Sequence, residues 1–141
     1  MSYQLSNDKH LIGPWVCEKV GLTWGPEGRE TIGVVEDNST VISGVIYENL
    51  TGKSVQCHIA VEGGLRKLLP AIFIYAFIQL KVEKMIAMVN TANPKSITFC
   101  CKLGFEPEAL IKDVYPDGDM VVLVLNKKDC MFLPQEVRQA A

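Results

Sequence analysis

The sequence predicts an α/β (α+β) fold in which a central mixed β-sheet carries helices on both of its faces. Three observations lead to this prediction. The length of 141 residues fits a single domain, which we expect to cover residues 1–141. Hydrophobic residues make up 48% of the chain and charged residues 21%, which is enough apolar material to build a core. β-branched segments fill the first half of the chain, and a strand–helix–strand–helix order follows.

The first elements are a short strand and a helix. The strand is expected over Tyr3–Leu5. The helix should begin at a cap formed by Asn7 or Asp8 and run towards Val20, although a Gly-Pro pair inside it weakens the prediction. Thr23–Arg29 contains two glycines and a proline, so we expect a loop there.

Three strands should then form an antiparallel meander. The first two, Glu30–Val35 and Val41–Tyr47, are β-branched runs separated by Asp, Asn and Ser, which favour turns. After Gly52, apolar and polar residues alternate along the third strand, Val55–Val61, as expected for a strand with two different faces.

After the meander the period of the pattern changes. Leu65–Leu80 predicts a buried helix, Met85–Val89 a fully apolar strand and Pro94–Leu103 a second helix. Together with Val55–Val61 this order predicts a β-α-β unit. Its two strands should be parallel and close together, joined by a right-handed crossover.

The chain should end in a hairpin and a tail. Glu108–Tyr115 and Met120–Asn126 flank Pro116–Asp119, whose residues favour a turn. Leu133–Ala141 is the only candidate tail.

Composition excludes several classes of function. The net charge of −2, from 14 basic and 16 acidic residues, lacks the strong positive field of a nucleic-acid-binding protein, so no nucleic acid is expected as a partner. The five cysteines show no C-x-x-C spacing and no zinc arrangement with the two histidines; we expect free thiols, no metal and a reducing cytoplasm. The first ten residues are polar, unlike a leader. The longest apolar run, Leu68–Ile78, is shorter than the roughly 20 residues that span a membrane, so no membrane partner is expected either.

The junction between the third meander strand and the next helix is the best candidate for an anion site. Proline is tolerated only in the first turn of a helix, so Pro70 places the helix start no earlier than about Arg66. Two basic residues then occupy a helix N-terminus, where acidic ones are favoured by about 0.3–1 kcal/mol. Glycines before them would let the backbone approach a phosphate, while an ordinary solvated loop is the alternative. The candidate residues are Gly63, Gly64, Leu65, Arg66 and Lys67.

The segment Asn93–Phe105, with the sequence NPKSITFCCKLGF, resembles the N-x-x-A/S-I-x-F-Y-x-K-L-G-F stretch of the GNAT family of acyl-CoA-dependent N-acetyltransferases. In addition, His58–Ala60 and Ala71–Leu80 resemble a subgroup of small GNAT proteins common in bacteriophages and prophages. The resemblance covers about residues 15–133. It implies the GNAT fold, acetyl-CoA as cofactor and an amine as acceptor.

The resemblance also implies where acetyl-CoA binds. In the family, the strand matching Val55–Val61 splays from the one matching Met85–Val89. Ile59 and Val61 would then pair with pantetheine through their backbone, and the N–H groups of residues 63–67 would hold the pyrophosphate. Asn93 matches the residue that starts the next helix beside the cofactor.

Three residues are candidate catalytic groups. His58, on the face opposite Ile59, could take a proton from the amine, and a hydrogen-bonded sheet histidine is the alternative. Glu62 could serve the same role or be a solvated rim residue. Cys100 stands where the family commonly has the tyrosine that protonates the leaving thiolate. A thiol of pKa about 8.5 could replace that tyrosine, or the residue could simply pack in the core.

Two hypotheses follow for the function. The first is a cytoplasmic acetyltransferase in which the amine attacks the thioester directly. The second is a catalytically inactive GNAT-fold module with a structural or protein-binding role, for example a phage virion or regulatory component. It is motivated by the missing tyrosine and by a phosphate loop that departs from the family's R/Q-x-x-G-x-G/A order. A homodimer or a phage protein is a possible partner.

Overall fold

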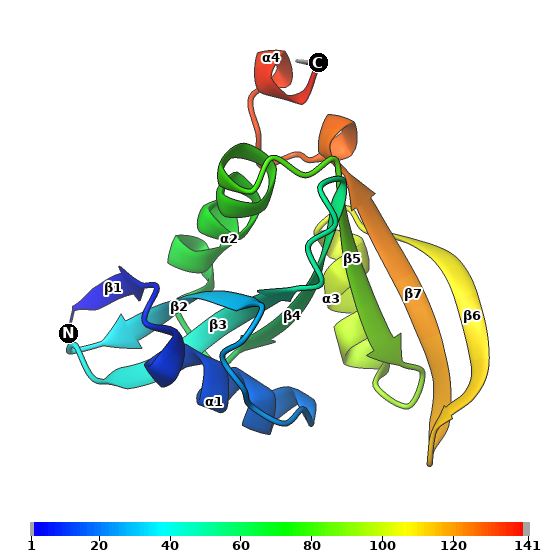
Figure 1. The fold of residues 1–141 in the computed structure, drawn as a ribbon, viewed down its shortest axis with the longest axis horizontal. Coiled ribbons are helices and arrows are strands. Elements are labelled where there is room, and N and C mark those ends of the chain that lie inside the picture. The colour runs from blue at the N-terminus through cyan, green and yellow to red at the C-terminus, as the bar shows by residue number, and fades with distance from the viewer. Residues whose placement is uncertain (1, 140–141) are drawn as a thin grey trace.

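The computed structural model describes residues 2–139. One seven-stranded sheet, in the order β1-β2-β3-β4-β5-β7-β6, forms its centre, and helices pack on both faces as predicted (Figure 1). The strands are β1 (Tyr3–Ser6), β2 (Arg29–Glu36), β3 (Thr40–Glu48), β4 (Ser54–Val61), β5 (Lys84–Asn90), β6 (Glu106–Tyr115) and β7 (Gly118–Asn126). The helices are α1 (Lys9–Val20), α2 (Leu65–Ile74), α3 (Pro94–Lys102) and α4 (Gln135–Arg138).

Helix α1 covers β2, β3 and β4 on one face of the sheet. Asp8 caps it, since the His10 N–H donates to Asp8 Oδ1 at 3.1 Å. The helix continues through Pro14, which faces solvent, while Ile12 and Val16 are fully buried against the sheet. Burial of two such side chains contributes about 3–6 kcal/mol, enough to offset the roughly 3 kcal/mol cost of an internal proline.

Two glycines let α1 lie close to the sheet. Gly33 and Gly44 are cross-strand partners on β2 and β3, and both face α1. A Cβ on Gly44 would lie 2.8 Å from the side chains of Ile12 and Val16. This contact could not be predicted from local patterns, because it depends on which residues of the two strands face each other.

Helices α2 and α3 pack on the opposite face and build the larger core. The predicted helix over 65–80 is α-helical only to Ile74 and continues as a π-helical segment, Tyr75–Gln79. In this segment the Leu80 N–H donates to the carbonyl of Tyr75, five residues back, at 2.9 Å. One turn earlier, the buried Tyr47 hydroxyl donates to the Ile72 carbonyl at 2.6 Å and ties α2 to β3.

Strands β4 and β5 form the parallel pair that the β-α-β order predicted. Their pairing is short: it runs only from Ser54 opposite Lys84 to Gln56 opposite Ile86. Beyond Gln56 the two strands diverge, as the dark green and lighter green arrows of Figure 1 show. All other neighbouring strands are antiparallel. The sheet is therefore open at its centre, on the side where β4 and β5 end.

The cysteines are free thiols: Cys17, Cys57, Cys100 and Cys130 are buried and Cys101 is exposed. Within residues 2–139, no helix combines the length and the apolar character that crossing a membrane requires.

Candidate functional site

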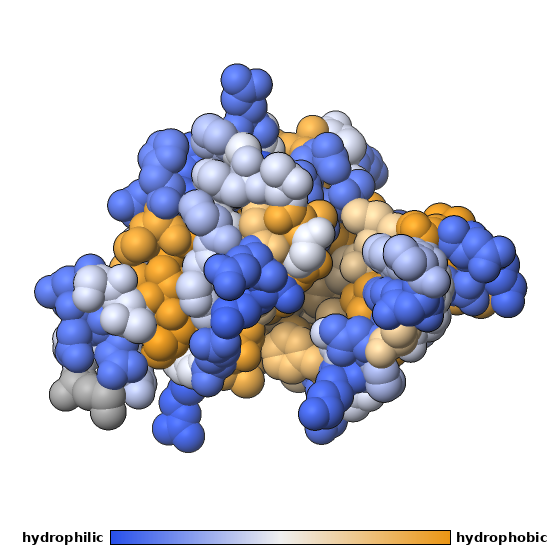
Figure 2. Space-filling view, turned by 90° about the horizontal axis from the view of Figure 1, so that it is seen from below, coloured by the Kyte–Doolittle hydropathy of each residue, from blue (hydrophilic) through white to orange (hydrophobic). Residues whose placement is uncertain are grey.

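A cleft of about 940 Å³ occupies the gap between the diverging strands β4 and β5. Figure 2 shows it as a hollow on the lower face of the molecule, bordered by both hydrophobic and hydrophilic residues. The C-terminal turn of α1, the end of β3, α3 and the β6–β7 hairpin complete its walls. Of the residues proposed from the sequence, those that line the cleft are His58, Ile59, Val61, Glu62, Asn93 and Cys100.

The alternation of β4 divides the cleft into two halves. Cys57, Ile59 and Val61 point towards α2 and α3, where they pack with the larger core. His58 and Ala60 point to the other face, towards α1. The orientation predicted for His58, opposite Ile59, is thus the one observed.

The edge of β4 is open along this cleft. Within the described chain, residues 57–61 have β3 as a strand partner on one side and no strand partner on the side of β5. Backbone N–H and C=O groups on such an edge can bind an extended ligand as if it were an added strand. The cleft therefore suits an elongated molecule that carries amide groups.

The chain passes from the end of β4 into α2, and at this junction several N–H groups of the helix N-terminus make no hydrogen bond within the described chain. The N–H groups of Gly64, Leu65 and Arg66 have no acceptor among the described residues, and no side chain there caps the helix. The side chains of Arg66 and Lys67 are exposed beside them. These features fit an anion.

The structure corrects the predicted set of five N–H donors. Gly63 N–H donates to the Ile42 carbonyl at 2.9 Å, and Lys67 N–H donates to the Gly64 carbonyl at 3.1 Å. The Gly63 N–H is engaged because the β3–β4 pairing continues to this residue. The Lys67 N–H is engaged because it forms part of the first turn of α2. Residues 63–67 also lie just outside the cleft lining, which ends at Glu62.

Gly64 is required by the fold itself. Its φ is +69°, in the left-handed region, and a Cβ there would lie 2.8 Å from Val34 Cγ1. We expect Gly64→Ala to lower the free energy of unfolding by about 2 kcal/mol, through left-handed strain and the contact with Val34. Urea unfolding followed by circular dichroism measures this change.

Gly63→Ala is the matched control for that substitution. Gly63 does not have a positive φ, and a Cβ there would make an ordinary 3.5 Å contact with Ile42. It should change stability by less than about 0.5 kcal/mol. Equal losses in the two variants would contradict this account of the junction.

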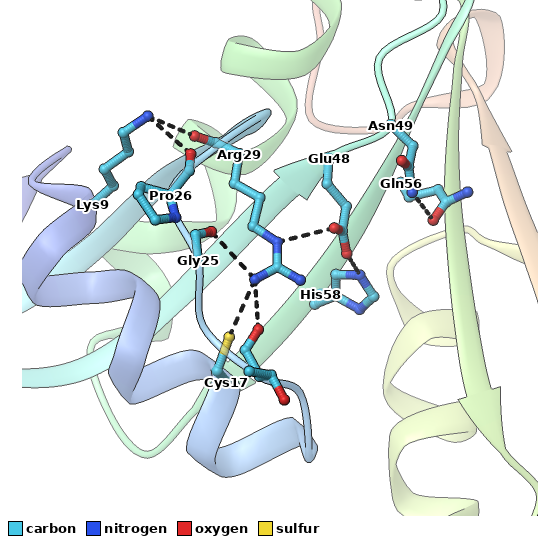
Figure 3. A network of polar contacts seen from close by, with 10 residues as sticks. Lys9, Cys17, Gly25, Pro26, Arg29, Glu48, Asn49, Gln56 and His58 are labelled. Atoms are coloured by element: carbon cyan, nitrogen blue, oxygen red, sulfur yellow. Dashed lines mark hydrogen bonds and ion pairs between the residues drawn. The ribbon is translucent and has the colours of Figure 1, made fainter.

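A buried polar network lies on the α1 side of the cleft (Figure 3). Arg29 Nε donates to Glu48 Oε1 at 3.0 Å, and Glu48 Oε2 lies 2.5 Å from His58 Nε2. Arg29 Nη1 also donates to the carbonyl of Thr23 at 2.8 Å, which fixes the guanidinium in place. The side chains of Arg29, Glu48 and His58 are only 16%, 17% and 12% exposed.

The protonation state of this network follows from its geometry. Burial would raise the pKa of Glu48, but hydrogen bonds and charge from Arg29 and His58 outweigh burial and lower it. Burial lowers the pKa of His58 and outweighs the opposing attraction of Glu48. Glu48 is therefore a carboxylate and His58 is neutral near pH 7. Because a carboxylate only accepts, His58 Nε2 carries the ring proton and Nδ1 has a free lone pair.

Sequence reasoning missed Glu48 and Arg29. They are directly opposite each other on β3 and β2, and His58 lies two positions along β4 from the partner of Glu48. The meander was predicted, but its register was not, and only the register brings these side chains to one spot. Tyr115, which lines the cleft from the end of β6, was also missed.

Glu62 and Cys100 are placed less favourably for the catalytic roles suggested for them. Glu62 Oε2 lies 2.5 Å from Lys19 Nζ, so its carboxylate is already paired. Cys100 is 6% exposed, and burial, with a smaller effect of Cys101, raises its pKa to about 11. Transfer of its proton to a thiolate of ordinary basicity, pKa about 8.5, is therefore unfavourable.

Asn93 caps the start of α3, the place that the family resemblance implied for it. Its side-chain oxygen accepts from the Ser96 N–H at 3.3 Å, and its amide donates to the Ser96 hydroxyl at 2.8 Å. Its position on the cleft wall places the N-terminus of α3 opposite β4.

No model of a known protein family matches this sequence, and no curated protein matches it. Solved structures do match. They include a chimera of Vibrio cholerae spermidine N-acetyltransferase SpeG and hSSAT, at a TM-score of 0.70 and 14% identity, covering 89% of this chain and 96% of that one. Mutant forms of the Vibrio cholerae spermidine/spermine N-acetyltransferase SpeG match at 0.71 and 14%, covering 89% and 95%. SpeG with manganese ions matches at 0.69 and 14%, covering 90% and 92%. The chain therefore has the GNAT-like acetyltransferase fold.

Proposed function

We propose that this chain is an N-acetyltransferase that uses acetyl-CoA and transfers the acetyl group to an amine by direct attack, without a covalent enzyme intermediate. One observation carries the proposal: the open edge of β4 leads directly into a helix N-terminus whose N–H groups at Gly64, Leu65 and Arg66 are uncommitted. The fold shared with solved acetyltransferases supports it. At 14% identity that likeness concerns the fold, and the acceptor has to be argued from the cleft.

The junction fits the diphosphate of CoA. Diphosphate oxygens would accept from the N–H groups of residues 64–66, in place of the missing side-chain cap. The side chains of Arg66 and Lys67 would add opposite charge, in a first turn that has no acidic residue. Two cations beside a helix N-terminus are repelled by its partial positive charge, and a bound anion would offset that repulsion.

The cleft fits the pantetheine arm. Its amide groups would pair with the backbone of Ile59 and Val61 on the open edge of β4. Ala87 and Val89 of β5 form the facing wall, which is apolar. Asn93 lies on the same side of the cleft, at the start of α3.

His58 would act as the general base. When bound, acetyl-CoA would supply a thioester carbon; the amine nitrogen would bond to it, the carbon–sulfur bond would break, and CoA would leave as the thiolate and take a proton from water. His58 Nδ1 takes the proton that the amine loses, directly or through water. Glu48 holds the ring by its Nε2 and stabilises the imidazolium, and Arg29 holds Glu48. Glu48 and Arg29 are positioning residues, because Glu48 uses its two carboxylate oxygens on Arg29 and His58 and Arg29 acts through Glu48.

Cys100 should be part of the cleft wall and not the proton donor for the thiolate. We expect Cys100→Ala to lower kcat by less than about threefold, because a buried thiol with a raised pKa is a weak acid. Steady-state rates at pH 7.5 measure the effect. A loss of about a hundredfold in kcat, with acetyl-CoA binding unchanged, would return the acid role to this residue.

A turnover assay tests the proposed function. The full chain is incubated with acetyl-CoA and primary amines, and the loss of thioester absorbance is followed together with the mass of the acetylated product. A thiol-reactive dye is unsuitable, because Cys101 is an exposed thiol of the protein. Acetylated amine that forms only with the protein present supports the proposal. If no amine is acetylated and no acetyl-CoA binds, the inactive structural or protein-binding module is the better description.

A further inference from the structure

The part of the cleft that faces α1 has a distinct composition. We call it the acceptor half, because the proposed base His58 points into it. Its lining combines apolar side chains, Val20, Leu22, Ala60, Met88 and Met120, with the amides of Gln56 and Asn90. The side-chain oxygens of these two amides already accept hydrogen bonds, from Asn49 Nδ2 and from the Ala92 N–H. Met88 and Met120 lie on the same face of the β5–β7 ladder, since the neighbouring Ala87 and Val121 pack into the core on the other face.

Each carboxylate that lines this cleft within residues 2–139 is already paired. Glu48 is held between Arg29, at 3.0 Å, and His58, at 2.5 Å. Glu62 is held by Lys19 at 2.5 Å. The acceptor half therefore offers apolar surface and charges that are already paired, with no carboxylate left over for an incoming cation.

From this pairing we infer that the acceptor is a primary amine on an apolar body that carries no second positive charge. The inference rests on the proposed function and names its substrate class. The reacting amine loses its charge before attack, but a second ammonium would stay charged in a cleft whose carboxylates already have partners, which is unfavourable. A polyamine is thus a poor acceptor, and an alkyl or arylalkyl monoamine, or a peptide N-terminus with an apolar first residue, is a good one.

Hexylamine and 1,6-diaminohexane form a matched pair for the test, because they differ only in the far ammonium. We expect kcat/KM to be at least about tenfold higher for hexylamine. 2-Phenylethylamine should behave like hexylamine, and a short peptide that begins with Leu distinguishes a peptide source from a free amine. Equal rates, or a preference for the diamine or for a polyamine, would overturn the inference while leaving the acetyltransferase in place.

Two lysine variants test whether the Lys19–Glu62 pair causes the preference for the monoamine. Lys19→Met frees the Glu62 carboxylate to pair with the far ammonium, so it should shift the ratio of the two kcat/KM values towards the diamine by about tenfold. Lys128→Met, an exposed lysine outside the cleft, should leave the ratio unchanged. An unchanged ratio in Lys19→Met would overturn the inferred role of the Lys19–Glu62 pair.

Calorimetry with acetyl-CoA distinguishes a failure of the inferred substrate class from a failure of the proposed function. If acetyl-CoA binds and none of the apolar amines is acetylated, the substrate class is wrong and the cofactor site stands. If acetyl-CoA does not bind and no amine reacts, the proposed function fails and the inference fails with it.

Discussion

Replacing His58 with asparagine should lower kcat by about a hundredfold at pH 7.5 and leave the affinity for acetyl-CoA unchanged. Asparagine can still donate to Glu48, so the network beside the cleft keeps a partner, but it has no basic nitrogen to accept the proton of the amine. The expected loss concerns the chemical step. Steady-state kinetics with a reactive amine measure kcat, and calorimetry measures acetyl-CoA binding on the same protein.

The chain contains a control for this variant, because it has two histidines. His10 lies exposed on α1, outside the cleft lining, and His10→Asn should retain wild-type rates. If His58→Asn keeps more than about a third of the wild-type kcat, His58 is a structural sheet histidine and the base must be sought elsewhere.

The pH dependence of the rate gives a second measure of His58. The base works only when it is neutral, and its pKa lies below the ordinary value of about 6.5, because burial and the Arg29 charge outweigh the attraction of Glu48. Activity should therefore persist at pH 6.5 and fall only at more acidic pH. This acidic fall in kcat/KM should be absent from the residual activity of His58→Asn. A fall centred above pH 7 would contradict the assignment.

Reversing the charges at the start of α2, in the double variant Arg66→Glu/Lys67→Glu, should weaken acetyl-CoA binding by about a hundredfold. The diphosphate would then meet two carboxylates beside N–H groups that are its expected ligands. Both side chains are exposed, so salt screens part of the effect and it should be largest at low ionic strength. Calorimetric titration with acetyl-CoA at two salt concentrations measures it.

The control is a second pair of adjacent lysines. Lys127 and Lys128 follow the end of β7, which pairs with the start of β5. Arg66 and Lys67 follow the end of β4, which runs parallel to β5, so the two pairs of basic residues lie at opposite ends of these strands. Lys127→Glu/Lys128→Glu changes the net charge by the same amount and should leave binding within about twofold of wild type. Equal weakening by both double variants would show a general charge effect and not a local site.

Much of the fold could be predicted from local patterns. Alternation in Val55–Val61, the turn residues after Val35 and the cap expected at Asn7 or Asp8 each act over a few residues, and the corresponding elements are present. The short parallel pairing of β4 and β5 agrees with the family resemblance, which implied that the strands splay. That splay has no local signal, because it depends on how the two halves of the sheet twist apart.

The candidate site was harder to predict, because its polar groups meet through tertiary register. Glu48 and Arg29 lie nineteen positions apart in the sequence and become hydrogen-bonded neighbours only when β2 and β3 pair. The glycines of the junction were interpreted as room for a phosphate, whereas Gly64 is already required by its positive φ and by Val34. Engagement of the Gly63 N–H by the Ile42 carbonyl likewise depends on the β3–β4 pairing, which the sequence does not specify residue by residue.

The most direct measurement compares two ligands in calorimetric titrations of the wild-type chain: acetyl-CoA, and S-acetylpantetheine, which lacks the diphosphate and the 3′-phosphoadenosine attached to it. We expect a micromolar dissociation constant for acetyl-CoA and one at least about tenfold higher for S-acetylpantetheine. The reason is that the N–H groups of Gly64, Leu65 and Arg66 have no acceptor among the described residues and can bind the diphosphate. No heat from acetyl-CoA up to about 1 mM, or equal affinity for the two compounds, would contradict the cofactor site.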